Sequence, residues 1–215
     1  QRLVTVELNE GLKRVGNYAF YRCPNLTSIN FPSTLEEIGD FAFDTCKTLV
    51  NAELNEGLKK IGRSAFARCK SLRNINFPST LEVIEESAFR GCESLVTAEL
   101  NEGLKVIGEE AFSCTSLTSM NFPSTLERIE EMAFKGCESL VTAELNEGLK
   151  VIGKGVFNEC DSLRNINFPS TLERIEEEAF TLCRCLVTAE LNEGLKVIGQ
   201  DAFAICPFTS INAPS

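Results

Sequence analysis

The protein has no histidine, no tryptophan and only two tyrosines among its 215 residues. The absence of histidine removes the commonest general base and the commonest metal ligand. The shortage of tryptophan and tyrosine removes the aromatic anchors that dominate many tight protein interfaces. No apolar stretch approaches the roughly 18 to 20 residues that a membrane helix needs, so we expect no membrane insertion.

Positive charge is also scarce. The chain has 21 Lys and Arg against 31 Asp and Glu, a formal net charge of −10 and a pI of about 4.7. Nucleic acids and anionic membranes both require a basic surface, so neither is expected as a partner. The first residues, Gln1-Arg2-Leu3-Val4, include no initiator methionine and no long apolar run. We therefore expect a fragment of a longer array, and the missing signal leaves the compartment unknown.

A repeat of 23 residues runs through the whole chain. Nine cysteines mark its phase: Cys23, Cys46, Cys69, Cys92, Cys114, Cys137, Cys160, Cys183 and Cys206. One step in this series is 22 residues, which we interpret as a deletion within Phe112-Ser113-Cys114. Residues 1–215 are therefore expected to form a single array of nine full repeats and a truncated tenth, which runs from Phe208 to Ser215.

The spacing within one repeat predicts a strand, a turn and a short helical segment. The fourth repeat has eight apolar positions: Leu72, Ile75, Phe77, Leu81, Ile84, Ala88, Phe89 and Cys92. Ile75 and Phe77 alternate with polar residues, as in a half-buried strand, and Pro78-Ser79-Thr80 follows as a turn. Ala88 and Cys92 are four residues apart, which would place them on one face of a helical turn. A single repeat cannot bury these residues, so we expect the copies to stack with parallel strands about 4.8 Å apart.

Together these residues read Leu-x-x-Ile-x-Phe-Pro-x-x-Leu-x-x-Ile-x-x-x-Ala-Phe-x-x-Cys from Leu72 to Cys92. This pattern resembles the signature of the BspA-like (Treponema pallidum-type) subclass of leucine-rich repeats, and the resemblance covers essentially the whole chain. It implies a right-handed solenoid with one β-strand and a short helical or 3-10 turn per repeat, and a parallel sheet on the concave face. Proteins of this kind are often surface-exposed or secreted and bind host or matrix proteins or mediate adhesion.

Odd and even repeats differ, so the true period is 46 residues. Odd repeats replace Phe-Pro with Leu-Asn and carry Ala (Val6 in the first repeat) where even repeats carry a larger residue. Ala98 and Leu100 alternate in this way with Met120 and Phe122. We offer a packing hypothesis, in which a small residue in one layer leaves space for the large residue of the next.

The cysteines offer little chemistry. Nine of them share one repeat position, so their side chains should point the same way, which is poor geometry for disulfides. We expect reduced, buried thiols. Cys183 and Cys185 form a Cys-x-Cys pair, but no second pair and no histidine accompanies them, so we expect no zinc site and no cofactor. Cys185 is instead predicted to be an exposed thiol.

The outward-facing side of the strands is the most informative surface. It carries alternating Glu and Asn side chains and two arginines on a polar background. We predict that ligand-binding residues lie here, on the concave face: Glu53, Arg73, Asn76, Glu99, Asn121, Glu144, Arg164, Asn167 and Glu190. The alternative is a solvated sheet face whose Asn and Glu side chains pair across strands. A docking surface would bind a protein or a glycan.

Catalysis is not expected. The strand glutamates recur every second repeat on an open sheet, whereas a catalytic site is normally a unique constellation. The main alternative to recognition is a structural spacer or self-assembling scaffold. The first repeat offers Leu3, Val6 and Leu8, and the last offers Phe208 and Ile211, without a polar cap, so we also consider end-to-end self-association.

Overall fold

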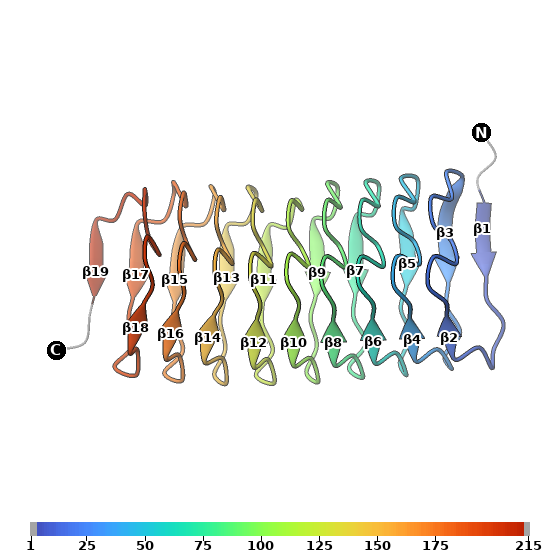
Figure 1. Ribbon diagram of the computed structural model, residues 1–215, viewed down its shortest axis with the longest axis horizontal. Helices are drawn as coiled ribbons and strands as arrows, with labels where there is room; N and C mark the ends of the chain where they lie inside the picture. Colours follow the sequence, from blue (N-terminus) through green and yellow to red (C-terminus); the bar gives the residue numbers. More distant parts are fainter. Residues whose placement is uncertain (1–3, 213–215) are drawn as a thin grey trace.

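The computed structural model describes residues 4–212, and these residues form 19 β-strands and no helix. The strands lie in two rows along the length of the molecule (Figure 1). The long-strand row consists of β1 (Val4–Glu7), β3 (Leu26–Asn30), β5 (Asn51–Glu53), β7 (Asn74–Asn76), β9 (Thr97–Glu99), β11 (Ser119–Asn121), β13 (Thr142–Glu144), β15 (Asn165–Asn167), β17 (Thr188–Glu190) and β19 (Ser210–Asn212). The short-strand row consists of β2 (Arg14–Val15), β4 (Glu37–Ile38), β6 (Lys60–Ile61), β8 (Val83–Ile84), β10 (Val106–Ile107), β12 (Arg128–Ile129), β14 (Val151–Ile152), β16 (Arg174–Ile175) and β18 (Val197–Ile198).

Every strand pairs in parallel with the equivalent strand of at least one neighbouring repeat. The short strands form one continuous sheet from β2 to β18. The long strands form three sheets, β1-β3-β5, β7-β9 and β11 to β19, which follow one another along the same side. Ile75 lies opposite Ala98 in the long row and Ile84 opposite Ile107 in the short row. The predicted solenoid is confirmed, and the short strands add a second sheet that we did not predict.

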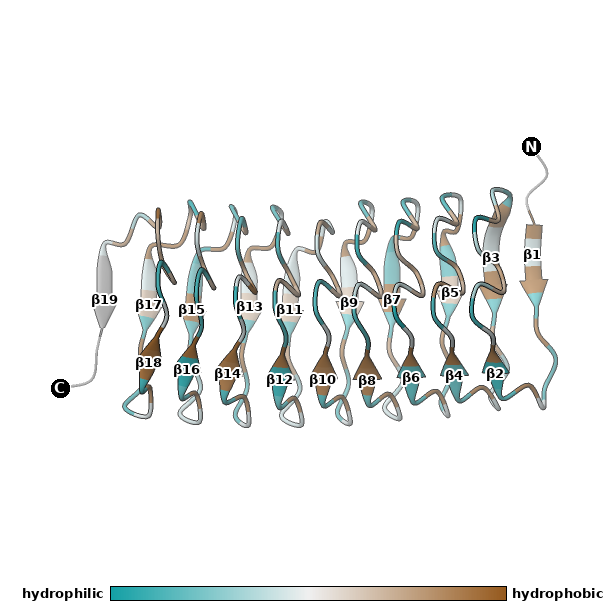
Figure 2. Cartoon of the chain, viewed as in Figure 1, coloured by the Kyte–Doolittle hydropathy of each residue, from teal (hydrophilic) through white to brown (hydrophobic). Residues whose placement is uncertain are grey.

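The core lies between the two rows. All eight apolar side chains of the fourth repeat are buried, as predicted. Phenylalanine rings stack from repeat to repeat, and the Phe66 and Phe89 rings lie nearly parallel with centroids 5.3 Å apart. Figure 2 shows β8, β10 and β14 as apolar throughout, because these strands read Val-Ile. Stacking thus provides the burial that one repeat cannot provide alone.

The predicted helical turn is wrong. Residues 85–92 form successive turns, with Ser87 and Gly91 in the left-handed region at φ 56° and 68°. The amide of Arg90 donates to Ser87 O within its own repeat at 3.0 Å, but the amide of Phe89 donates to Ala111 O of the next repeat at 2.7 Å. A helix would satisfy these groups internally, whereas this segment shares them alternately with its neighbour. Gly155, at φ 60°, occupies the first left-handed position of its repeat, which explains its presence there.

The fifth repeat also departs from our prediction. Cys114 is exposed, and Thr115 takes the buried cysteine position instead. The Thr115 hydroxyl donates to Phe112 O at 2.9 Å and contacts the Cys137 thiol at 3.2 Å. The missing residue therefore follows Thr115, between the core threonine and Leu117, and not within Phe112-Ser113-Cys114.

The cysteine ladder has a hydrogen-bonding role. The Cys92 thiol donates to Phe66 O of the preceding repeat at 3.1 Å, and Cys69 and Cys160 make the equivalent bond. Burial raises the pKa of Cys92 to about 12, so the thiol keeps its proton. All ten cysteines are free, and Cys185 is exposed as predicted.

The phenylalanines that follow the long strands of even repeats contact rings of two repeats. The Phe77 ring meets the Phe89 ring of its own repeat at 5.5 Å and the Phe112 ring of the following odd repeat at 6.2 Å, in both cases edge to face. Ala98, the small residue opposite Ile75, belongs to that same odd repeat. This arrangement agrees with the packing hypothesis for the 46-residue period.

The turns that lead from the long strands to the short strands form a rim of the solenoid. Hydrogen bonds between neighbouring turns on this rim give a second structural reason, besides core packing, for the alternation of odd and even repeats. The Asn101 amide of an odd turn donates to Phe77 O of the preceding even repeat. The neighbouring Glu102 carboxylate accepts from Ser124 N at 3.1 Å and from Ser124 Oγ at 3.0 Å in the following even repeat. The odd turns of the third, fifth and seventh repeats thus each bond to an even turn on both sides.

Candidate interaction surface

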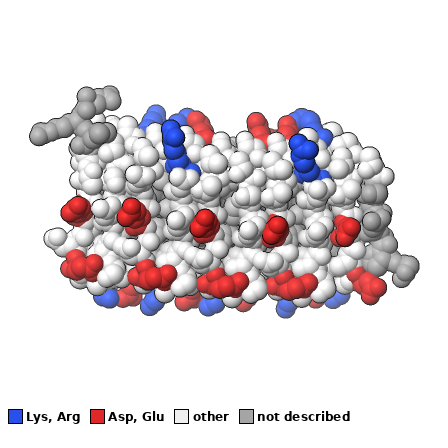
Figure 3. Space-filling view, turned by 180° about the vertical axis from the view of Figure 1, so that it is seen from behind, with Lys and Arg blue, Asp and Glu red and all other residues white. Residues whose placement is uncertain are grey.

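The nine predicted site residues share one face of the solenoid, and all nine side chains are exposed. Glutamates and asparagines alternate at the ends of β5, β7, β9, β11 and β13, and β15 and β17 extend the series. Within the paired strands, Asn76 lies opposite Glu99, Asn121 opposite Glu144 and Asn167 opposite Glu190. Arg73 directly precedes β7, and Arg164 directly precedes β15. We call this surface the long-strand face; Figure 3 shows its acidic side chains in two lines with basic side chains beside them.

The two acidic lines differ in their chemistry. The rim line includes Glu56, Glu102 and Glu147, whose carboxylates each accept hydrogen bonds from a serine amide and hydroxyl of the next repeat. These bonds hold the pKa of each of the three carboxyls below its ordinary value. The rim carboxylates are therefore structural.

The strand line begins at Glu7, at the end of β1, and includes Glu53, Glu99, Glu144 and Glu190. Among the residues that the structure describes, none of these carboxylates makes a hydrogen bond or an ion pair. Asn76 lies opposite Glu99 in register, but their side chains are not bonded. Thr97 Oγ1 instead donates to Asn74 Oδ1 at 2.6 Å. Within the part of the chain that the structure describes, no hydrogen bond of the kind that the alternative predicted joins an Asn to a Glu across neighbouring long strands.

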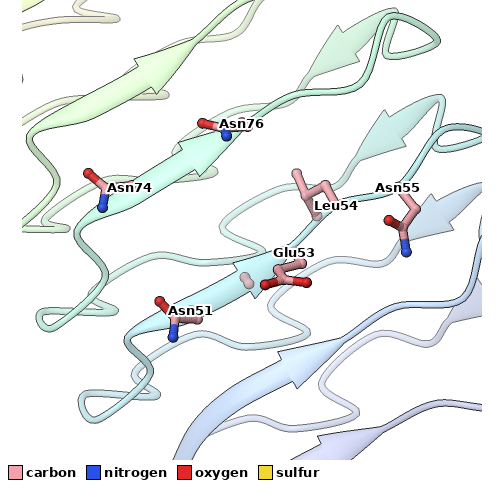
Figure 4. A pocket seen from close by; sticks show the side chains of 7 residues that line it. Asn51, Glu53, Leu54, Asn55, Asn74 and Asn76 are labelled. Carbon is pink, nitrogen blue, oxygen red and sulfur yellow. The ribbon is translucent and has the colours of Figure 1, made fainter.

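Shallow hollows recur along the strand line at every second repeat. One of about 370 Å³ is formed by Asn51, Glu53 and Leu54 on one side and Asn74 and Asn76 on the other (Figure 4). The equivalent hollows of about 350 and 290 Å³ contain Glu99 and Glu144. Each also includes the strand alanine, namely Ala52, Ala98 or Ala143. These hollows were not predicted, although the alternation of Ala with larger residues in the sequence was the available signal.

A line of exposed valines runs beside the strands, on the side where the strands begin. Val50, Val96, Val141 and Val187 are each between 36% and 40% exposed. Backbone hydrogen bonds from Val96 N to Arg73 O and from Arg164 N to Val141 O place the two arginines in the same line. Neither arginine makes an ion pair with any described residue. The face therefore combines an apolar and basic line with an acidic, polar one.

The described residues give no support for a metal site at the Cys-x-Cys pair. Cys183 is buried, and its thiol donates to Phe157 O at 3.2 Å, whereas Cys185 is exposed. Across residues 4–212 no group of three or more acidic or cysteine side chains is arranged to hold a metal ion. No helix in this part of the chain is long and apolar enough to cross a membrane.

The fold and the repeat define the class of protein as a leucine-rich repeat solenoid. Residues 2–114 and 105–215 each match the family model of the BspA type leucine-rich repeat region, which spans six copies. The chain belongs to the BspA-type leucine-rich repeat family, which confirms the predicted resemblance. As a leucine-rich repeat array it is a repeat-based protein-interaction module, of a class that uses its extended surface for binding.

Solved structures share this fold. The pneumococcal vaccine antigen PcpA is 24% identical with a TM-score of 0.57, over 96% of this chain and 61% of that one. A leucine-rich repeat protein from Eubacterium ventriosum is 18% identical with a TM-score of 0.51, over 96% and 83% of the two chains. The T. pallidum leucine-rich repeat protein is 27% identical with a TM-score of 0.46, over 92% and 73%. No curated protein sequence matches the chain.

Proposed function

We propose that the protein is a non-catalytic recognition module that binds a protein or a glycan along its long-strand face. The distribution of ion pairs supports this proposal. The described residues form 14 ion pairs, and none of them involves a strand-line glutamate, Arg73 or Arg164. Each of the 14 pairs contains a different lysine or arginine, so most basic side chains elsewhere in the described part of the solenoid are paired, whereas the strand-line glutamates, Arg73 and Arg164 remain available to a ligand.

The geometry of the face favours binding over chemistry. Its hollows are open and nearly identical, and each repeats the same Glu and Asn side chains. An enzyme site requires side chains in distinct environments that differ in acidity or reactivity. A repeated surface instead offers many equivalent weak contacts, which together give affinity for an extended ligand.

Binding of the protein to arrays of matrix proteins and of glycans tests this proposal. A variant with Glu99→Lys and Glu144→Lys should lose the captured ligands. The matched control carries Glu109→Lys and Glu127→Lys, which make the same charge change at exposed positions on the short-strand side. Equal capture by both variants would contradict the assignment of the surface. Loss of capture in both would indicate a response to net charge.

The alternative function is a structural spacer or self-assembling scaffold. It predicts that no array ligand is captured at all, and that sedimentation velocity shows association that grows with protein concentration. Capture by a monomer would exclude it.

A further inference from the structure

The long-strand face has a period of its own. Glu53, Glu99, Glu144 and Glu190 occur at every second repeat, and the hollows beside the first three have the same spacing. Because neighbouring parallel strands lie about 4.8 Å apart, equivalent groups recur about every 9.6 Å along the solenoid. A ligand that engages all of them must present matching groups at the same interval.

Among regular peptide conformations, polyproline II fits this interval. It has three residues per turn and rises about 3.1 Å per residue, so every third side chain returns to the same side after about 9.3 Å. The mismatch over the four carboxylates is about 1 Å, which flexible side chains absorb. An α-helix returns to the same side after seven residues, or about 10.5 Å, and falls out of step by about 3 Å over the same length. A β-strand alternates its side chains, so residues three apart point in opposite directions.

The charge of the face selects the side chains of such a ligand. The strand-line carboxylates have no partner among the described residues, so a lysine or arginine at every third position would find one carboxylate per turn. Glu53, Glu99 and Glu144 each lie in a hollow beside uncharged polar groups. Glu99, for example, lies beside Thr97, Ser119 and Asn121. A polyproline II backbone has no internal hydrogen bonds, so its carbonyl groups can accept bonds from these side chains.

The line of exposed valines can contact apolar side chains on a second side of the ligand. Val50, Val96, Val141 and Val187 also recur every second repeat, with the period of the carboxylates. An apolar residue such as proline, at the position that follows or precedes each basic residue, would contact them. Arg73 and Arg164 lie between valines and can donate hydrogen bonds to ligand carbonyls.

We propose that the long-strand face binds a basic polypeptide segment in the polyproline II conformation, with lysine or arginine at every third residue and its axis along the solenoid. This inference rests on the proposed recognition function and names the ligand class for the same face.

A synthetic peptide of about four Pro-Pro-Lys copies is the direct probe, since it holds polyproline II and places its lysines about 9.3 Å apart. A shuffled peptide of the same composition, with lysines clustered, keeps the charge and removes the period. Isothermal titration or fluorescence anisotropy at low salt should show that the regular peptide binds about tenfold more tightly. A helical peptide with lysine at every seventh position should bind no better than the shuffled one.

Variants then locate the binding. Glu99→Gln with Glu144→Gln should weaken binding of the regular peptide by about three- to tenfold, since each exposed ion pair contributes little on its own. Glu109→Gln with Glu127→Gln should leave it unchanged. Equal affinity for regular and shuffled peptides would overturn the inference, because attraction would then depend on charge alone. Failure of every peptide to bind would overturn it too, whereas capture of an array ligand sensitive to Glu99 and Glu144 would leave the recognition function standing.

Discussion

Exchanging Ile75 and Ala98 tests whether packing explains the alternation of repeats. The two residues lie opposite each other on β7 and β9, and both are buried, with 1% and 7% of their surface exposed. Ile75→Ala leaves a cavity in the core and should cost about 2–5 kcal/mol of unfolding free energy. Ala98→Ile inserts a branched side chain opposite Ile75 and should cost about 1–3 kcal/mol.

If the small residue exists to accommodate its large neighbour, the double variant should be less destabilised than the sum of the two single variants. We expect a recovery of at least about 1 kcal/mol, because the two changes conserve the total volume at one contact. Urea unfolding followed by far-UV circular dichroism measures this recovery through the midpoint and the slope of each transition. An unchanged slope would show that the variants unfold as the original protein does.

Ile29→Ala combined with Ala98→Ile is the matched control. Ile29 is equally buried but lies on β3, which does not neighbour β9. These two changes should add within about 0.5 kcal/mol. If the pair at Ile75 and Ala98 is just as additive, alternating residue size is not the reason for the 46-residue period.

Further predictions concern the rim and the thiols. Glu102→Gln should lower the thermal unfolding midpoint at pH 7 and make that midpoint less dependent on pH. The pKa of Glu102 is lowered in the folded protein, so its contribution to stability is present above the ordinary pKa of 4.5 and is lost as pH falls through the folded-state pKa. Calorimetry that shows the same pH dependence for the variant and the original protein would refute this. Cys92→Ala should lower the free energy of unfolding in urea by about 1–2 kcal/mol, because it removes buried volume and the hydrogen bond from the thiol to Phe66 O. An unchanged free energy of unfolding would show that the cysteine ladder does not stabilise the fold. In the native protein, alkylation followed by mass spectrometry should modify Cys114 and Cys185 first, since both are exposed, and rapid labelling of Cys92 would contradict the burial described above.

The fold was largely predictable because the repeat itself encodes it. Alternation at Ile75 and Phe77 identified the strand, and the eight apolar positions of the repeat identified the core. The helical turn failed for a physical reason. A spacing of three or four residues between Ala88, Phe89 and Cys92 also suits successive turns, and only the hydrogen bonds between repeats distinguish the two structures. Those bonds join residues 21 or 22 positions apart, which no local pattern reveals.

The position of the fifth-repeat deletion was missed for a related reason. Aligning Cys114 with the other cysteines matched residue type, but the core position requires a small side chain that donates a hydrogen bond, and Thr115 meets that requirement. Side-chain direction on the long-strand face followed from strand alternation, so the predicted surface residues are all exposed. Which carboxylates bond within the protein could not be predicted, because Glu56 and Glu53 have the same chemistry and differ only in what the next repeat places beside them.

The bonds on the rim restrict how such an array can change its length. An odd turn presents an asparagine to one neighbour and a glutamate to the other, and an even turn presents the serine and the carbonyl that receive them. Removing or duplicating a single repeat would place two like turns side by side, with carboxylate facing carboxylate or serine facing serine. Gene segments that code for these proteins should therefore be gained and lost by recombination in pairs of repeats, and shortened arrays should remain stable when trimmed by an even number of copies.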